Sequence, residues 1–154
     1  MLVNEDALNI RIGHSPDPDD AFMFHALTNG TIDTGNRTYE HVLVDIDTLN
    51  REAQIGSFEV SAVSIHSYPK ISDSYYLMNC GASMGEGYGP ILVSDSEMSV
   101  EEAKRSVIAI PGKSTSSYLA LVLALGDVEV REVPFDKILP GVLDGKYDAG
   151  VIIH

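Results

Sequence analysis

The sequence predicts an α/β fold of two lobes, in which parallel or mixed sheets are covered by helices. Short apolar stretches of strand length alternate along the chain with stretches whose apolar side chains recur at helical spacing. Several strand-like stretches are too continuously apolar to have one face in water, which is typical of parallel strands buried under helices. The chain has 154 residues and 44% hydrophobic content, enough for one compact core or for two small lobes that share a hinge.

The first half of the chain begins with a strand and a helix. Residues 8–13 alternate apolar and polar side chains, which predicts a strand that Ser15 and two prolines end. Residues 19–29 carry apolar side chains at helical spacing, and Gly30 marks the end of that helix. The further expected elements are strands at 38–45, 58–63, 75–78 and 90–94, a helix at 48–55 and a brief helix or turn at 64–71.

The second half repeats this alternation. Ser99 and Glu102 have the capping-box spacing that precedes a short helix. The expected strands are 106–110, 128–133 and 148–153, and the expected helices are 116–125 and 135–143, the second with Pro140 inside it. The small polar run SDSEMS separates the two groups of elements, so we place lobe 1 at 1–95 and the start of lobe 2 at 96–154.

Composition excludes several classes of partner. Lysine and arginine total 10 against 23 aspartates and glutamates, so the net charge of −13 would repel nucleic acid phosphates. The single Cys80 has no intrachain disulfide partner, and Glu5 and Asp6 stand where a secretory signal carries basic residues. No apolar run approaches the roughly 18 residues that a membrane span needs. We therefore expect a cytoplasmic protein with neither a nucleic-acid nor a membrane partner.

The acidic turn GHSPDPDD, residues 13–20, allows two interpretations. A calcium loop would need a central glycine and a late glutamate, and both are missing, which disfavours a metal site. In the other interpretation, Ser15 or Asp17 caps the following helix, a proline presets its first turn and the acids lie at its positive end. The carboxyl end of a parallel strand is also where α/β folds bind ligands, so capping and binding are compatible.

Two features of the second half suggest a ligand. PGKSTSSY, residues 111–118, puts one lysine and four hydroxyls at a helix start, which suits a carboxylate or phosphate, although a cap with surplus hydroxyls explains it equally well. His154 follows an apolar strand and is either a base that works near pH 7 or a surface residue. The other four histidines lack metal-ligand spacing, and we interpret most of them as ordinary polar or half-buried residues; they are His14, His25, His41 and His66.

Seven motifs occur in an order that resembles a known family: GHSPDPDDAFMF, DIDTLN, VSAVSIHSY, GEGYGP, PGKSTSSY, FDKILPGVLDG and GVIIH. Together they look like the 1,4-dihydroxy-6-naphthoate synthase family of menaquinone biosynthesis by the futalosine pathway. That family has the two-lobed, periplasmic-binding-protein-like type II fold. The resemblance covers nearly the whole chain from Ile10 and corresponds to the N-terminal part of the family's chain.

The resemblance implies a cofactor-free carbon–carbon lyase. It would bind cyclic dehypoxanthine futalosine between the lobes, release the sugar-derived part and leave the dihydroxynaphthoate ring. The family's base matches His154, and its substrate contacts match Ala62, Val63, Ser64, Ser116 and Ser117. From the same motifs we add as expected substrate-binding residues Ser15, Asp20, Asn50 and Thr115. No metal and no organic cofactor is implied, and the expected partner is a small-molecule carboxylate.

The chain also departs from the family pattern. Asp17, Asp19 and Ala21 stand where the family has cysteine, asparagine and threonine, and Ala62 stands where it has lysine, which leaves the exact substrate open. Family chains continue beyond the Ile-Ile-His strand. We therefore expect a fragment or shortened product, incomplete at its C-terminus, that binds weakly or associates, with a homo-oligomer as one expected state.

Two other functions stay open. One is chorismate dehydratase of the same pathway, which the Ser-Pro-x-Pro-x-Asp turn and the terminal histidine disfavour. The other is a non-catalytic small-anion-binding protein of the transporter type. Fold alone does not separate an enzyme from a binding protein. The missing secretory signal and the position of His154 favour the enzyme.

Overall fold

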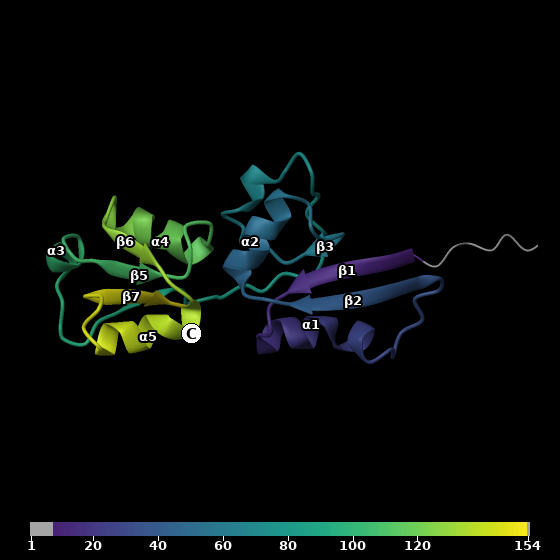
Figure 1. Cartoon of the computed structure of the whole chain (residues 1–154), viewed down its shortest axis with the longest axis horizontal. Helices are drawn as coiled ribbons and strands as arrows, with labels where there is room; N and C mark the ends of the chain where they lie inside the picture. The colour runs from purple at the N-terminus through teal and green to yellow at the C-terminus, as the bar shows by residue number, and fades with distance from the viewer. Residues whose placement is uncertain (1–7, 154) are drawn as a thin grey trace, which may run out of the picture. The chain divides into compact units, whose positions relative to one another are not determined.

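The computed structural model describes residues 8–153, which form two compact units. The first unit contains residues 8–63 and 68–83, and the second contains 64–67 and 84–153. Each unit has its own parallel strand pairing and its own helices (Figure 1). The lobe boundary expected at residues 95–96 stays a prediction about the whole protein.

The first unit is built on a three-stranded parallel sheet in the order β2-β1-β3. Strand β1 (Leu8–His14) pairs along its whole length with β2 (Arg37–Leu43) and over two residues with β3 (Val60–Ser61). Helix α1 (Pro18–Thr28) and helix α2 (Ile46–Gln54) lie on opposite faces of this sheet (Figure 1). The central strand is therefore bonded at both edges and covered on both faces.

Helix α2 packs very closely on β1 because the strand has a glycine at the contact. A Cβ atom on Gly13 would lie 2.8 Å from the side chains of Leu49 and Phe58. Leu49 is fully buried and Ile12, on the neighbouring position of the strand, is 2% exposed. Successive strand residues point to opposite faces, so Gly13 faces α2 while Ile12 and His14 face α1.

The second unit contains a mixed four-stranded sheet in the order β4-β7-β5-β6. Strand β5 (Ile108–Ile110) is parallel to β6 (Val130–Glu132) and to β7 (Ala149–Ile152). Strand β4 (Ile91–Val93) is antiparallel to β7. All three residues of β5 are fully buried, as expected for a central strand covered on both faces.

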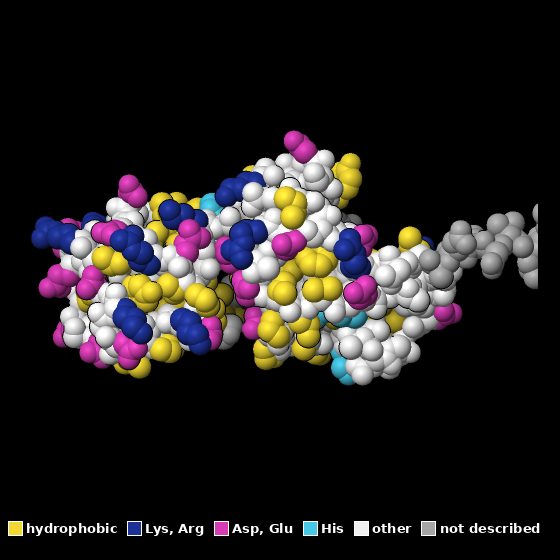
Figure 2. Space-filling model, viewed as in Figure 1, with side chains coloured by type: hydrophobic (Ala, Val, Ile, Leu, Met, Phe, Trp, Pro, Cys, Tyr) yellow, Lys and Arg dark blue, Asp and Glu magenta, His cyan; other side chains and the backbone are white. Residues whose placement is uncertain are grey.

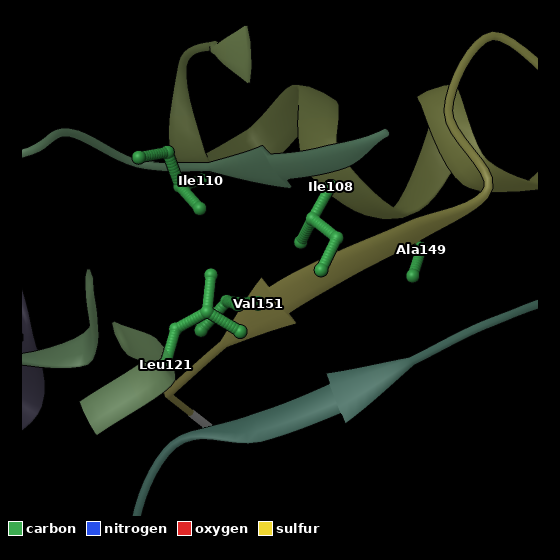
Figure 3. Packing of buried hydrophobic residues seen from close by; sticks show 5 residues of the cluster. All are labelled: Ile108, Ile110, Leu121, Ala149 and Val151. Carbon is green, nitrogen blue, oxygen red and sulfur yellow. The ribbon is translucent and has the colours of Figure 1, made fainter. Parts of the chain in front are cut away.

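Helices α4 (Ser116–Leu125) and α5 (Phe135–Leu143) cover opposite faces of this sheet (Figure 1). Figure 3 shows the core on the α4 side, where Leu121 meets side chains of β5 and β7. On the other side, α5 approaches β7 so closely that a Cβ on Gly150 would lie 2.4 Å from Ile138. The short helix α3 (Val100–Ala103) begins with the expected capping box between Ser99 and Glu102.

The α/β class with parallel and mixed sheets is confirmed, and two helices coincide with the predicted ranges 116–125 and 135–143. The strand predicted at 75–78 is wrong. Within residues 8–153, no strand pairs with this segment, and Tyr76 is 94% exposed. The segment is attached instead through a side chain, because the hydroxyl of Tyr75 donates to the carbonyl of Phe58 at 2.6 Å. Before it, residues 68–70 form a 3₁₀ turn, η1 (Tyr68–Lys70).

The visible surface carries both signs of charge. Asp and Glu side chains are spread over the surface of both units, with Lys and Arg among them (Figure 2). None of the helices formed by residues 8–153 is both long and apolar enough to cross a bilayer.

Strand β3 has only two residues, and next to it the carboxylate of Glu59, rather than a backbone carbonyl, accepts the N–H of Arg11 in β1. Glu59, just before β3, accepts hydrogen bonds from the backbone N–H of Arg11 at 2.8 Å and from its guanidinium at 3.2 and 3.1 Å. These side-chain and backbone bonds lower the pKa of Glu59 from its usual 4.5 to about 2. Both side chains are nearly half exposed, so water and salt screen the pair.

We predict that Leu121→Ala destabilises the second unit by about 2–5 kcal/mol, because it opens a cavity between α4 and the sheet. Leu121 is 6% exposed, whereas Leu123 on the same helix is 78% exposed. The matched change Leu123→Ala should therefore stay within about 0.5 kcal/mol of the parent chain. Denaturant titration monitored in the second unit measures both values. Equal losses in the two variants would contradict the packing described for α4.

We predict that part of the acid sensitivity of the first unit comes from Glu59. Its pKa is lower in the folded chain, so its stabilising effect is complete above pH about 4.5 and is lost as pH falls toward about 2. At low salt, the unfolding midpoint of Glu59→Gln should vary less with pH over this window than that of the parent chain. High salt should reduce this difference between the two proteins. Glu97→Gln, an exposed carboxylate, is the control. An unchanged acid profile in Glu59→Gln would refute this role.

Candidate functional site

The carboxyl ends of the three parallel strands of the first unit lie at one edge of its sheet. Two backbone hydrogen bonds continue the pairing past the strands: the N–H of Val44 donates to His14 O at 3.1 Å, and the N–H of Ala62 donates to Gly13 O at 2.8 Å. The turn after β1, the start of α2 and the residues after β3 are therefore neighbours. This edge carries the predicted residues Ser15, Asp20, Asn50, Ala62 and Val63, and α/β folds bind ligands at such edges.

Ser15 is held by hydrogen bonds at each of its polar groups. Its N–H donates to Asp20 Oδ2 at 2.7 Å, its hydroxyl donates to Asp17 Oδ2 at 2.8 Å, and its carbonyl accepts from His14 Nδ1 at 3.0 Å. Ser15 is 6% exposed and Asp20 is 9% exposed. The two residues predicted to contact ligand are thus bonded to each other, and whether they contact substrate stays a prediction.

The helix cap differs in detail from the expected one. Asp17 occupies the N-cap position and Pro18 the first turn, but the Asp17 carboxylate accepts from Ser15 rather than from a helix N–H. Asp20, in the first turn, reaches back to the N–H of Ser15 instead. Both carboxylates remain at the positive end of the helix dipole, which favours their charge.

Two histidines that the sequence analysis treated as ordinary residues form a pair beneath this turn. His14 is 4% exposed, and its Nε2 lies 3.0 Å from Nδ1 of His41. Phe24 of α1 packs against both imidazole rings, at centroid distances of 4.5 Å and 5.8 Å. Burial lowers the pKa of His41, and the charge of His14 lowers it further. Sequence reasoning missed this pair, because the contact depends on the register between β1 and β2, which residue type does not report.

The N-terminus of α2 also lies at the carboxyl edge of the first unit's sheet. Asp45 caps the helix by accepting from the N–H and hydroxyl of Thr48 at 2.9 and 2.7 Å. Burial raises the pKa of Asp45, but the bonds from Thr48 and the charge of Arg51 outweigh it, so the net pKa is lowered. Asn50, one turn further along, is fully buried. Whether Asn50 contacts substrate stays a prediction.

The residues expected after β3 are half-buried. Ala62 and Val63 follow β3 directly in the first unit, whereas Ser64 belongs to the second. The side chain of Ala62 carries no charge or hydrogen-bonding group, so any polar contribution at this position comes from its backbone.

A second predicted group lies where β5 leads into α4. Thr115 is the N-cap residue of α4 and is 2% exposed, and its hydroxyl accepts from the N–H of Tyr118 at 3.3 Å. The same hydroxyl donates to Gly112 O at 2.7 Å and lies 2.9 Å from the hydroxyl of Ser117, which is 3% exposed. These two hydroxyls are therefore committed to the helix start.

Ser116 differs from its two neighbours. It is half-buried, and within residues 8–153 its hydroxyl bonds to no other group. Lys113 is exposed and, in the same part of the chain, its ammonium forms no ion pair. A hydroxyl and an ammonium at the start of a ten-residue helix suit a carboxylate or phosphate.

His154, the predicted base, lies outside the described residues. Strand β7 ends two residues earlier, at Ile152, and runs parallel to β5. Among residues 8–153, no three or more His, Cys, Asp or Glu side chains are grouped as a metal site would require. One shallow hollow of the second unit lies at the opposite, amino end of β7, lined by Asp95, Ser96, Met98, Val142, Leu143, Gly145, Tyr147 and Asp148.

Comparison with known proteins gives a consistent result. The sequence profile of a family described as "Menaquinone biosynthesis" matches residues 10–154. The chain is 39% identical over 146 residues to a 1,4-dihydroxy-6-naphthoate synthase of Thermus thermophilus and 34% identical over 151 residues to one of Streptomyces coelicolor. Both comparisons cover 94% of this chain and 52% of the relative. The chain therefore spans about half the length of these curated relatives.

Solved structures show the same fold. A crystal structure of an Archaeoglobus fulgidus protein is 48% identical, with a TM-score of 0.88 over 95% of this chain and 54% of that one. The periplasmic aliphatic sulphonate binding protein of Escherichia coli has a TM-score of 0.63 at 16% identity, over 95% of this chain and 54% of that one. At this identity the second similarity concerns fold alone, and it confirms the periplasmic-binding-protein-like class.

We predict that Thr115→Ala lowers stability by about 0.5–2 kcal/mol, because α4 loses its cap and the buried hydroxyl of Ser117 loses a partner. Ser116→Ala is the matched control one residue away and should stay within about 0.5 kcal/mol. Denaturant titration measures both. A larger loss in the Ser116 variant would show that the roles of the two hydroxyls are assigned the wrong way round.

Proposed function

The chain belongs to the menaquinone biosynthesis family, and from this premise we propose that the whole protein is a 1,4-dihydroxy-6-naphthoate synthase. The proposed reaction is that of a carbon–carbon lyase, which releases the naphthoate ring from cyclic dehypoxanthine futalosine. The observation that carries the proposal is the similarity to two curated synthases, which extends over 94% of this chain.

His154 is the proposed base. Neutral imidazole accepts a proton near pH 7, so proton abstraction from the substrate needs no further group of the protein. The support for this role is the match of GVIIH to the family's Ile-Ile-His strand and the position of His154 in the sequence, two residues after the end of β7.

Substrate binding is proposed to involve the residues of both carboxyl edges. Ser116 is the best-supported candidate for a direct substrate contact, because its hydroxyl has no protein partner within the described chain and Lys113 is nearby in the sequence. Ser117 and Thr115 act by holding the helix start that presents it. The residues from Ala62 to Ser64 contribute through the backbone and the Ser64 hydroxyl. A small-molecule carboxylate is the proposed partner, and a cytoplasmic location is supported by the single, unpaired Cys80.

A non-catalytic binding protein is the alternative from another class, since proteins with that role share this fold. Chorismate dehydratase is the alternative enzyme. The two curated relatives are both named as synthases, which favours the main proposal.

We predict that His154→Ala in the whole protein lowers kcat/KM for cyclic dehypoxanthine futalosine by about 10²–10⁴-fold, the usual contribution of a general base. Because the imidazole is proposed to take a proton rather than to anchor the substrate, affinity for the naphthoate product should change little. Release of naphthoate, followed by chromatography, and calorimetric titration with product measure the two effects.

His25→Ala is the control, because His25 is exposed on the last turn of α1 and outside the proposed site. It should turn over substrate like the parent protein. A parent protein that binds the substrate and releases no naphthoate would favour the binding protein. Turnover of chorismate in place of the futalosine would favour the dehydratase.

A further inference from the structure

The His14–His41 pair links the two longest strands of the first unit to the turn that follows β1. His14 is in register with Leu43, and His41 is in register with Ile12, so the two histidines are diagonal neighbours on the face that α1 covers. Their rings meet edge to face, with centroids 5.2 Å apart and an interplanar angle of 86°. Two nitrogen atoms at hydrogen-bond distance need a defined proton between them.

The bonding partners of His14 fix where the protons are. The carbonyl of Ser15 accepts hydrogen bonds and has no proton to give, so Nδ1 of His14 is the donor in the 3.0 Å contact. In neutral His14, Nε2 then carries a lone pair and accepts from Nδ1–H of His41. Only this arrangement of two neutral rings satisfies both contacts.

The surroundings of His41 disfavour every other arrangement. Its Nε2 is buried and has no hydrogen-bond partner among the described residues. A proton added to His41 would have to lie there, as a buried donor without an acceptor. If Nε2 of His14 became the donor instead, the proton of His41 would be displaced to the same position. Burial, the larger cause, lowers the pKa of His41, in agreement with a neutral ring.

The His14–His41 pair contacts the turn through a single atom, the carbonyl oxygen of Ser15. His14 holds the Ser15 carbonyl, while Asp20 holds the Ser15 N–H and Asp17 accepts from the hydroxyl. Without the bond from His41, Nε2 of His14 would be left unpaired at a site that is 4% exposed, and the ring would lose one of its two fixed directions. Phe24 packs on both rings from α1, the helix that also supplies Asp20.

We propose that His14 and His41 are positioning residues, joined in a single tautomeric arrangement, that fix the Ser15 carbonyl and so hold the turn from Ser15 to Asp20 in one conformation. That this conformation is the one that contacts substrate rests on the proposed function. The bonding arrangement itself does not, and it is open to direct measurement.

The bonding arrangement is tested by nitrogen-15 spectra of the whole protein labelled at histidine. We expect both His14 and His41 in the Nδ1–H tautomer and a scalar coupling between His14 Nε2 and His41 Nδ1. An Nε2–H tautomer at His14, or no coupling between these nitrogens, would overturn the pairing.

The effect on the turn is tested with two variants of His41. In His41→Asn, the side-chain amide places a donor near the former Nδ1 position, whereas His41→Leu keeps apolar volume and removes the donor. We expect His41→Leu to raise KM about five- to tenfold with kcat within about twofold of the parent, and to speed hydrogen exchange at the N–H of Ser15. His41→Asn should restore both values. His25→Leu, on the exposed side of α1, is the control and should change neither.

The outcomes separate the two proposals. Equal effects of His41→Leu and His41→Asn, or unchanged exchange at Ser15 in His41→Leu, would overturn the positioning role. If the parent protein releases no naphthoate, the proposed function fails. In that case the scalar coupling and the exchange at Ser15 still decide whether the histidine pair holds the turn.

Discussion

The first unit depends on the central position of β1, because a strand bonded at both edges has to be covered on both faces. Gly13 lets Leu49 and Phe58 approach one face to 2.8 Å of where a Cβ would be, which brings α2 onto the strand. The opposite face carries Ile12 and His14 under α1. Gly13 therefore sets how closely α2 packs on the strand, and His14 supplies the polar contact on the face covered by α1. The position of the turn after β1 depends on both of these packing contacts.

The second unit meets the same constraint with different side chains. Its buried central strand β5 lies between β6 and β7, and Gly150 on β7 allows Ile138 of α5 to pack directly on the backbone. The apolar cluster under α4 covers the other face. Because β5 is fixed in this way, the residues after it enter α4 at a defined point. Thr115 and Ser117 complete that entry and leave the hydroxyl of Ser116 as the group available to a ligand.

The sequence predicted the helices and caps that depend on interactions between residues close together in the chain. The ranges of α4 and α5 followed from apolar spacing and end signals, and the Ser99–Glu102 box followed from four residues. The segment 75–78 has strand-forming residues, but a strand also needs backbone pairing with a partner strand, and residue type does not report that pairing. The bond between Ser15 and Asp20 depends on the path of the turn, and the His14–His41 contact depends on the register of two strands 27 residues apart. Neither register nor turn path is encoded in residue type.

The aspartates of the turn after β1 form hydrogen bonds within the fold. Asp17 and Asp20 each accept a hydrogen bond from Ser15, and both lie in the first turn of α1 or at its N-cap, so both carboxylates have protein partners without any bound molecule. Their hydrogen-bond donors, the N–H and hydroxyl of Ser15, are neutral, so carboxylates at this position would repel a substrate carboxylate of the proposed reaction. The ammonium of Lys113 and the hydroxyl of Ser116 have the opposite character, since they attract or donate to an anion. We therefore propose that the start of α4 binds the substrate carboxylate, and that the turn after β1 contributes shape rather than charge recognition.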